Sequence, residues 1–100
     1  METTKVVFTN HRSGEVQLFS GDNKIGKMDI AITGGNVTVY HTEVEPEYEG
    51  HGFAKILLNK LVSYAKENGM KIIPLCPYVN LQFRHHPEVY ADIWFKVEAS

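Results

Sequence analysis

The sequence has little cysteine, little excess charge and no long apolar segment. Its single cysteine excludes an internal disulfide and a four-cysteine metal site, and a lone thiol is typical of a reducing compartment. Ten lysine and arginine residues against twelve aspartate and glutamate residues give a formal net charge of −2, which argues against a nucleic-acid or acidic-membrane partner. No apolar segment approaches the ~20 residues that cross a bilayer, and the N-terminal residues lack the features of a secretory signal. We therefore expect a cytoplasmic protein.

The length and composition fit one globular unit. With 100 residues, of which 43% are hydrophobic and 22% charged, the chain matches the size of a typical domain. No repeat, linker or low-complexity segment interrupts it, so we expect residues 1–100 to form a single domain. Trp94 and Phe95 could close its core or face a partner, and we expect a monomer or a weak dimer.

The first 45 residues have the pattern of antiparallel strands. β-Branched and aromatic residues occupy residues 6–8, 15–20, 24–33 and 36–44, and turn residues separate these segments. Gly34 and Gly35 predict a two-residue hairpin turn between the last two strands. Regular alternation in the last strand predicts one face made of Val37, Val39, His41 and Glu43 and another made of Thr38, Tyr40, Thr42 and Val44.

The apolar spacing then changes to three and four residues. This spacing from Phe53 to Ala65 predicts an amphipathic helix that ends near Gly69. Residues 71–75 predict a short strand, and Pro77 can open a second helix that runs to about residue 85, because Pro87 bars its continuation. We therefore expect an α+β fold: four antiparallel strands, a long helix, a fifth strand parallel to the fourth, and a short C-terminal helix.

Two glycines flank the predicted start of the long helix. Gly50 and Gly52 let backbone N–H groups approach an anion, and a helix N-terminus adds unpaired donors and about half a positive charge. A phosphate or diphosphate is the natural occupant. The alternative is a tight turn before a helix, because short glycine motifs are frequent. The acidic residues Glu45, Glu47 and Glu49 are equally explained as side chains that offset the helix dipole.

This turn resembles the acetyl-CoA signature of the GNAT acetyltransferases, which consists of Arg or Gln, two residues, Gly, one residue, and then Gly or Ala. The signature falls on residues 49–54, EGHGFA, with Glu49 in place of the usual Arg or Gln. The segments HTEV (41–44), IIPLCPYV (72–79) and RHHPEVYAD (84–92) are similar to a short group within that family, with an H-T-E-V, P-L-C-P and R-H-P-E-Y pattern. The resemblance extends over nearly the whole chain and implies a GNAT-like mixed sheet.

The resemblance also implies a cosubstrate, acetyl-CoA, and roles for particular residues. Backbone amides of the turn would bind the CoA diphosphate, and the end of the fourth strand would pair with the pantetheine arm. The cofactor-binding residues implied in this way are Thr42, Glu43, Val44, Glu49, Gly50, His51, Gly52, Phe53, Ala54, Lys55, Cys76 and Phe83. Larger members of the family place two helices between strands one and two. Residues 10–14 are too few for these helices, so the acceptor site must be reduced, open or different.

Cys76 lies just before Pro77, near the N-cap of the second predicted helix. The helix dipole stabilises a thiolate there, although free cysteines are more often small buried apolar residues. The resemblance places Cys76 beside the pantetheine. Seven residues later the family often has a tyrosine that reprotonates the CoA thiolate, and this chain has Phe83, which carries no acidic hydroxyl.

Two transfer mechanisms follow from these residues. In the first, Cys76 attacks the acetyl thioester and passes the acetyl group on. In the second, an acceptor amine attacks acetyl-CoA directly, Cys76 shapes the site or protonates the thiolate, and Glu43 or His41 is the general base. Both could instead be solvated residues of a half-exposed sheet. Arg84, His85 and His86 form a polar helix end that could meet CoA phosphates; the adjacent histidines point about 100° apart, so we expect no metal site.

Three functions therefore remain open. The first is an acyltransferase that moves the acetyl group to an unidentified acceptor, with an amine favoured. The second is a non-catalytic module that binds or senses acetyl-CoA. The third is an interaction domain whose G-x-G segment is only a turn.

Overall fold

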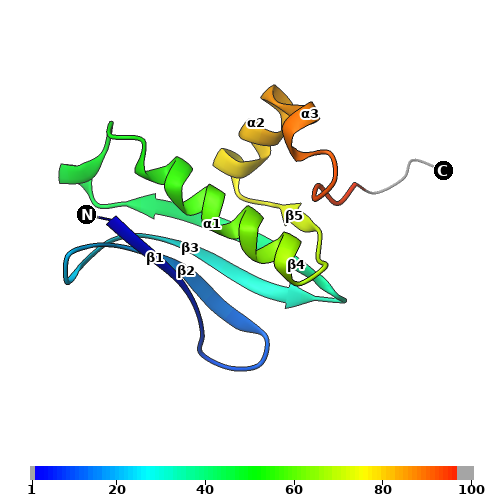
Figure 1. The fold of residues 1–100 in the computed structure, drawn as a ribbon, viewed down its shortest axis with the longest axis horizontal. Coiled ribbons are helices and arrows are strands. Elements are labelled where there is room, and N and C mark those ends of the chain that lie inside the picture. Colours follow the sequence, from blue (N-terminus) through cyan, green and yellow to red (C-terminus); the bar gives the residue numbers. More distant parts are fainter. Residues whose placement is uncertain (1, 97–100) are drawn as a thin grey trace.

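The computed structural model describes residues 2–96, which form one five-stranded sheet and three helices. The strands lie in the order β1-β2-β3-β4-β5. Helix α1 crosses one face of the sheet, and α2 and α3 lie beyond β5 (Figure 1). The elements are β1 (Glu2–Phe8), β2 (Ser13–Ser20), β3 (Asn23–Thr33), β4 (Asn36–Val44), the 3₁₀ turn η1 (Pro46–Tyr48), α1 (Phe53–Glu67), β5 (Ile72–Pro74), α2 (Pro77–His85) and α3 (Pro87–Tyr90). In this part of the chain, no helix is long and apolar enough to cross a membrane.

The pairing of the strands confirms the predicted α+β topology. Strands β1 to β4 pair antiparallel, and β5 pairs parallel to β4. Helix α1 buries Leu57, Leu58, Leu61 and Ala65 against the sheet. Each buried leucine contributes about 1.5–3 kcal/mol relative to an exposed one, so this face of α1 fixes the helix, and with it the turn at its N-terminus, on the sheet.

Strand β4 contains an irregularity that its sequence does not predict. His41 pairs with Asp29, but the next pair of the ladder joins Val39 to Ile30. Tyr40 is therefore the extra residue of a β-bulge, which inserts one residue into one strand of an antiparallel pair.

The bulge reverses the faces of the second half of β4. Thr42 and Val44 pair with residues of the core face of β3 and therefore lie on the same face as Val39. His41 and Glu43 lie on the opposite, exposed face. The predicted alternation is wrong beyond Val39, because a period of two holds only along an unbroken ladder.

Strands β4 and β5 diverge after a short stretch of pairing. They pair from Val37 to Val39 on the β4 side, and β5 ends at Pro74, which has no N–H for a further ladder hydrogen bond. Beyond β5, the backbone N–H of Cys76 donates a 2.9 Å hydrogen bond to the carbonyl oxygen of Val39. Residues 40–44 of β4 therefore have no strand beside them on this edge.

The C-terminal segment closes the core beside β5. Pro87 stops α2 as predicted, and it also begins a third short helix, which the sequence pattern does not predict. The ring of Phe83 stacks on Tyr90 at 4.6 Å and meets Trp94 edge-on at 5.5 Å. Trp94 also pairs with Ile72. Of the two alternatives for Trp94, the structure supports the one in which it packs on the core.

Candidate functional site

A cavity of about 660 Å³ opens where β4 separates from β5. This volume lies within the range of small-molecule sites, roughly 300–1,000 Å³. Four parts of the chain contribute to it: the end of β4, the turn η1, the start of α1 and the start of α2. The lining residues are His41, Thr42, Glu43, Val44, Pro46, Tyr48, Glu49, Gly50, Gly52, Phe53, Ala54, Lys55 and Tyr78.

The start of α1 leaves backbone donors free beside this cavity. Gly50 and Gly52 have φ values of 82° and 78°, a left-handed conformation that glycine adopts without a Cβ clash. No side chain caps the helix, and in residues 2–96 the N–H groups of residues 50 to 52 donate no hydrogen bond. Phe53 and Ala54 add N–H groups of the first helical turn, which have no partner inside a helix. The site therefore has the donors of an anion site.

The charges around the cavity have both signs. Glu43 and Glu49 line it, and Lys55 is the only lysine or arginine among its described lining residues. Lys55 stands in the first turn of α1, three residues after Gly52. A single cation and several N–H donors at one end of the cavity favour a phosphate group at that end.

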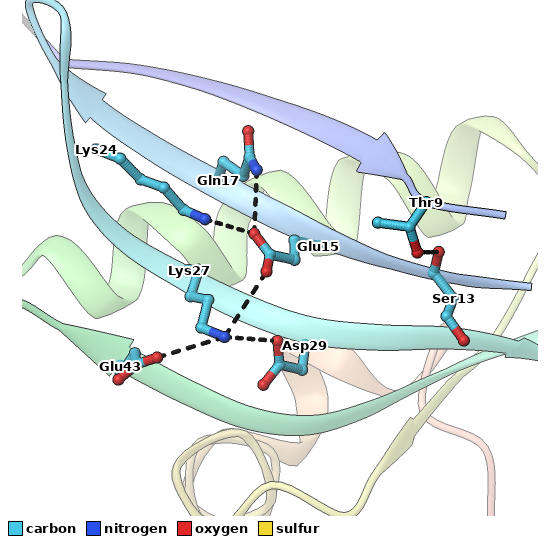
Figure 2. A network of polar contacts seen from close by, with 8 residues as sticks. All are labelled: Thr9, Ser13, Glu15, Gln17, Lys24, Lys27, Asp29 and Glu43. Carbon is cyan, nitrogen blue, oxygen red and sulfur yellow. Dashed lines mark hydrogen bonds and ion pairs between the residues drawn. The ribbon is translucent and has the colours of Figure 1, made fainter.

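A network of ion pairs connects Glu43 to the exposed face of the sheet (Figure 2). Lys27 Nζ lies 3.0 Å from Asp29 Oδ1, 3.5 Å from Glu43 Oε1 and 3.7 Å from Glu15 Oε2. The hydrogen bond to Asp29 raises the pKa of Lys27 above its usual value, and the neighbouring carboxylates add to this effect. Lys27 therefore holds the Glu43 carboxylate at the edge of the cavity.

The sulfur of Cys76 lies behind a threonine rather than in the cavity. Cys76 is 2% exposed and does not line the cavity. It occupies the N-cap position of α2, yet its side chain does not cap that helix. Its Sγ lies 3.2 Å from Thr42 Oγ1, and Thr42 is a lining residue.

Most residues predicted to bind the cofactor line this cavity, and three of them do not. His51 has its ring beside that of Phe53, at 5.7 Å. Cys76 is covered as described. Phe83 is 0% exposed and lies in the core, so it offers no surface to a ligand. Arg84, His85 and His86 lie at the opposite end of α2 from Tyr78, outside the cavity lining.

Sequence analysis missed Tyr78, Pro46 and Tyr48 as lining residues. Tyr78 lies two residues after Cys76 in the first turn of α2, and this proximity was the available signal. Burial raises the pKa of Tyr78 above its usual value of 10.0, and the nearby acidic groups of Tyr90 and Cys76 raise it further. Its phenol is therefore protonated at neutral pH and can donate a hydrogen bond.

Comparison with known families identifies this arrangement. Residues 15–93 match the model of the GCN5-related N-acetyltransferase family. The chain belongs to this family. Membership implies transfer of an acetyl group from acetyl-CoA, and the mixed sheet with β5 parallel to β4 is the fold of GCN5-related N-acetyltransferases.

Solved structures of similar fold support the assignment of the fold. The ribosomal-protein-alanine N-acetyltransferase of Brucella melitensis has 15% identity and a TM-score of 0.70, over 100% of this chain and 96% of that chain. A GCN5-like protein of Staphylococcus aureus has 22% identity and a TM-score of 0.67, over 94% and 90% of the two chains. The aminoglycoside N-acetyltransferase AAC(6')-Iy, in complex with CoA, has 15% identity and a TM-score of 0.54, over 92% and 66%. No curated protein sequence matches this GCN5-related chain significantly.

Proposed function

We propose that the chain binds acetyl-CoA in the cavity between β4 and α1 and transfers the acetyl group to an amine. The observation that carries this proposal is the set of free N–H groups at the start of α1, which open onto a cavity that also includes the end of β4. Such donors suit a diphosphate. The family to which the chain belongs uses acetyl-CoA.

The residues present fit this cosubstrate in three places. The amides of residues 50–54 and the ammonium group of Lys55 would hold the diphosphate. Residues 42–44, which have no strand beside them on the β5 edge, offer main-chain groups to the pantetheine arm. Thr42 and Tyr78 line the cavity from β4 and α2, beside the proposed place of the thioester. When bound, acetyl-CoA supplies a thioester that an amine can attack.

The transfer that we propose is direct, without an acyl-cysteine. A nucleophile must reach the thioester, whereas Cys76 is 2% exposed and lies behind Thr42. Glu43 or His41, both at the cavity edge, takes one proton from the ammonium group of the acceptor, and the neutral amine then attacks the thioester carbon. The C–N bond forms as the C–S bond breaks, and the second proton of the nitrogen passes to water. The Tyr78 phenol gives its proton to the departing sulfur and regains one from water. This role for Tyr78 replaces the acid that Phe83 cannot provide.

The acceptor that we propose is an amine that approaches from the exposed face of the sheet. The Glu43 side chain is 55% exposed on this face, and no described helix lies between β1 and β2. The carboxylates of Glu43 and Glu49 at the cavity attract a protonated amine. Two structural neighbours are named as N-acetyltransferases, one of ribosomal-protein alanine and one of aminoglycosides. Their names support an amine as the class of acceptor, but not a particular amine.

Calorimetric titration and a thiol-release assay test this function. We expect acetyl-CoA to bind at sub-millimolar concentration and at least one amine, from a panel of peptides, polyamines and amino sugars, to release free CoA. Binding without release from any amine would favour the sensor alternative. If acetyl-CoA does not bind, the remaining hypothesis is an interaction domain.

Matched variants test the assigned roles. Tyr78→Phe is expected to lower kcat about a hundredfold, with little change in acetyl-CoA affinity. This is the small end of the range for a general acid, because a thiolate leaves readily. Tyr40→Phe is its control, because Tyr40 is 49% exposed and outside the cavity lining. His41→Gln and Glu43→Gln identify the base: the variant with the larger loss of kcat, and with the acid limb of its pH profile removed, marks the residue.

A further inference from the structure

The contact between Cys76 and Thr42 joins the only cysteine of the chain to a lining residue of the cavity. The sulfur and the threonine oxygen are 3.2 Å apart, well within hydrogen-bond range for sulfur. Cys76 comes from the start of α2, and Thr42 from the part of β4 that the bulge turns toward the core face. The contact therefore depends on two features that are distant in the sequence.

Either side chain can donate the hydrogen of this contact, and the direction decides whether the Thr42 hydroxyl keeps a free hydrogen. A threonine hydroxyl has one hydrogen and two lone pairs, whereas a thiol is a weak donor and a weak acceptor. Cys76 is buried and does not cap α2, and Thr42 Oγ1 is the side-chain atom that the structure places within hydrogen-bond distance of its sulfur. If the thiol donates to Thr42, the hydroxyl hydrogen of Thr42 remains free to point into the cavity.

We propose that Cys76 is a positioning residue: its thiol donates to Thr42 Oγ1, and the Thr42 hydroxyl thereby donates a hydrogen bond to the acetyl end of bound acetyl-CoA. No bond to sulfur forms or breaks in this role. The ligand part of the inference rests on the proposed function, whereas the contact between the two side chains does not.

The first test observes the contact without any ligand. The chain has one cysteine, so its infrared spectrum contains one S–H stretching band. We expect this band at lower wavenumber in the wild type and in Thr42→Ser than in Thr42→Val, because only Val removes the acceptor. The same band position in all three proteins, or no S–H band in the wild type, would overturn the proposal.

The second test measures acetyl-CoA affinity by calorimetry. Cys76→Ala and Thr42→Val are each expected to weaken binding about fivefold, the effect of one neutral hydrogen bond. Cys76→Ser keeps a donor and is expected to stay within about twofold of the wild type. The double variant Cys76→Ala/Thr42→Val is expected to bind no more weakly than either single variant, because each substitution alone already removes the same hydrogen bond to the ligand. Wild-type affinity in Cys76→Ala, or additive losses in the double variant, would contradict the inference.

The third test separates positioning from nucleophilic catalysis. A positioning role predicts that Cys76→Ser keeps kcat/KM near the wild-type value, while Cys76→Ala lowers it about fivefold. A nucleophile predicts equal loss in both, together with an acetyl adduct on the wild type, measured by intact mass, that Cys76→Ser lacks. Thermal unfolding of each variant verifies that it is folded.

The proposed function and this inference fail in different ways. If the wild type binds acetyl-CoA but acetylates no amine, transferase activity is refuted, and the infrared and affinity tests still decide the inference. If acetyl-CoA does not bind, both the proposed function and the proposed hydrogen bond from Thr42 to the acetyl group are refuted. An unshifted S–H band refutes the contact whatever the activity.

Discussion

Replacing Gly50 by alanine tests whether the left-handed turn before α1 creates the anion site. Gly50 has φ 82°, and an added Cβ would meet no atom within 4 Å. The cost is therefore conformational, about 1–2 kcal/mol for an L-residue in the left-handed region. We expect the turn to relieve this strain by rotating its peptide groups, and the rotation misdirects the N–H groups of residues 50 to 52.

Gly35 provides a matched control for this change. It has the same φ of 82°, and an added Cβ there also meets nothing within 4 Å. It lies in the turn between β3 and β4, outside the lining of the cavity. Gly35→Ala should therefore cost as much stability as Gly50→Ala, and urea unfolding should record about 1–2 kcal/mol for each, with Tm lower by about 4–8 °C per kcal/mol.

The two variants should differ in their affinity for CoA. A hydrogen bond to a charged group contributes about 1.5–3 kcal/mol, so losing one phosphate contact should weaken binding roughly ten- to hundredfold in Gly50→Ala. Gly35→Ala should bind as the wild type does. Calorimetric titration with CoA measures both. Equal affinities at equal stability losses would refute the claim that these amides hold the diphosphate.

Two further predictions concern charged side chains. Lys55→Gln should weaken CoA binding about two- to fivefold at low salt, the effect of one exposed charge pair. The difference in affinity should shrink at high salt. Lys60→Gln, on the same helix but outside the cavity lining, is the control in the same titration. The hydrogen bond from Lys24 lowers the pKa of Glu15 below 4.5, so its contribution to stability is present above that pH and is lost as pH falls through the lowered pKa. Urea unfolding should therefore find Glu15→Gln less stable than the wild type at pH 7 by up to about 1 kcal/mol, with a difference that vanishes in acid; a constant difference would contradict this account.

The sequence predicts the regular elements well because their signals are local. Gly34 and Gly35 mark the turn between β3 and β4, and the spacing of apolar residues in α1 matches its buried face. The G-x-G segment likewise marks the turn at the cavity. Each of these signals lies within a few residues of the structure that it predicts, so no tertiary information is needed.

The features that the sequence does not predict depend on contacts between distant segments. The bulge at Tyr40 arises from the register in which β3 and β4 pair. No residue type in β4 predicts it. The family's general-acid tyrosine is expected seven residues after Cys76. That position is Phe83, which is buried on the core face of α2. Tyr78 precedes the buried Val79 and lies about 100° from it around the helix, which explains why a neighbouring position lines the cavity.

The bulge also explains how so short a chain can separate two chemical tasks. Without the extra residue, Thr42 and Val44 would lie on the exposed face, and His41 and Glu43 would point into the core, since a shift of one residue exchanges the faces of a strand. With it, Thr42 meets the buried Cys76, while Glu43 joins the ion pairs of the exposed face. Both faces of β4 reach the same cavity, because β5 has ended at Pro74 and no described strand pairs with that edge. A ligand held from the α1 side and an acceptor that arrives from the exposed face can therefore meet at the end of one strand, without the two helices that larger members of the family place between their first strands.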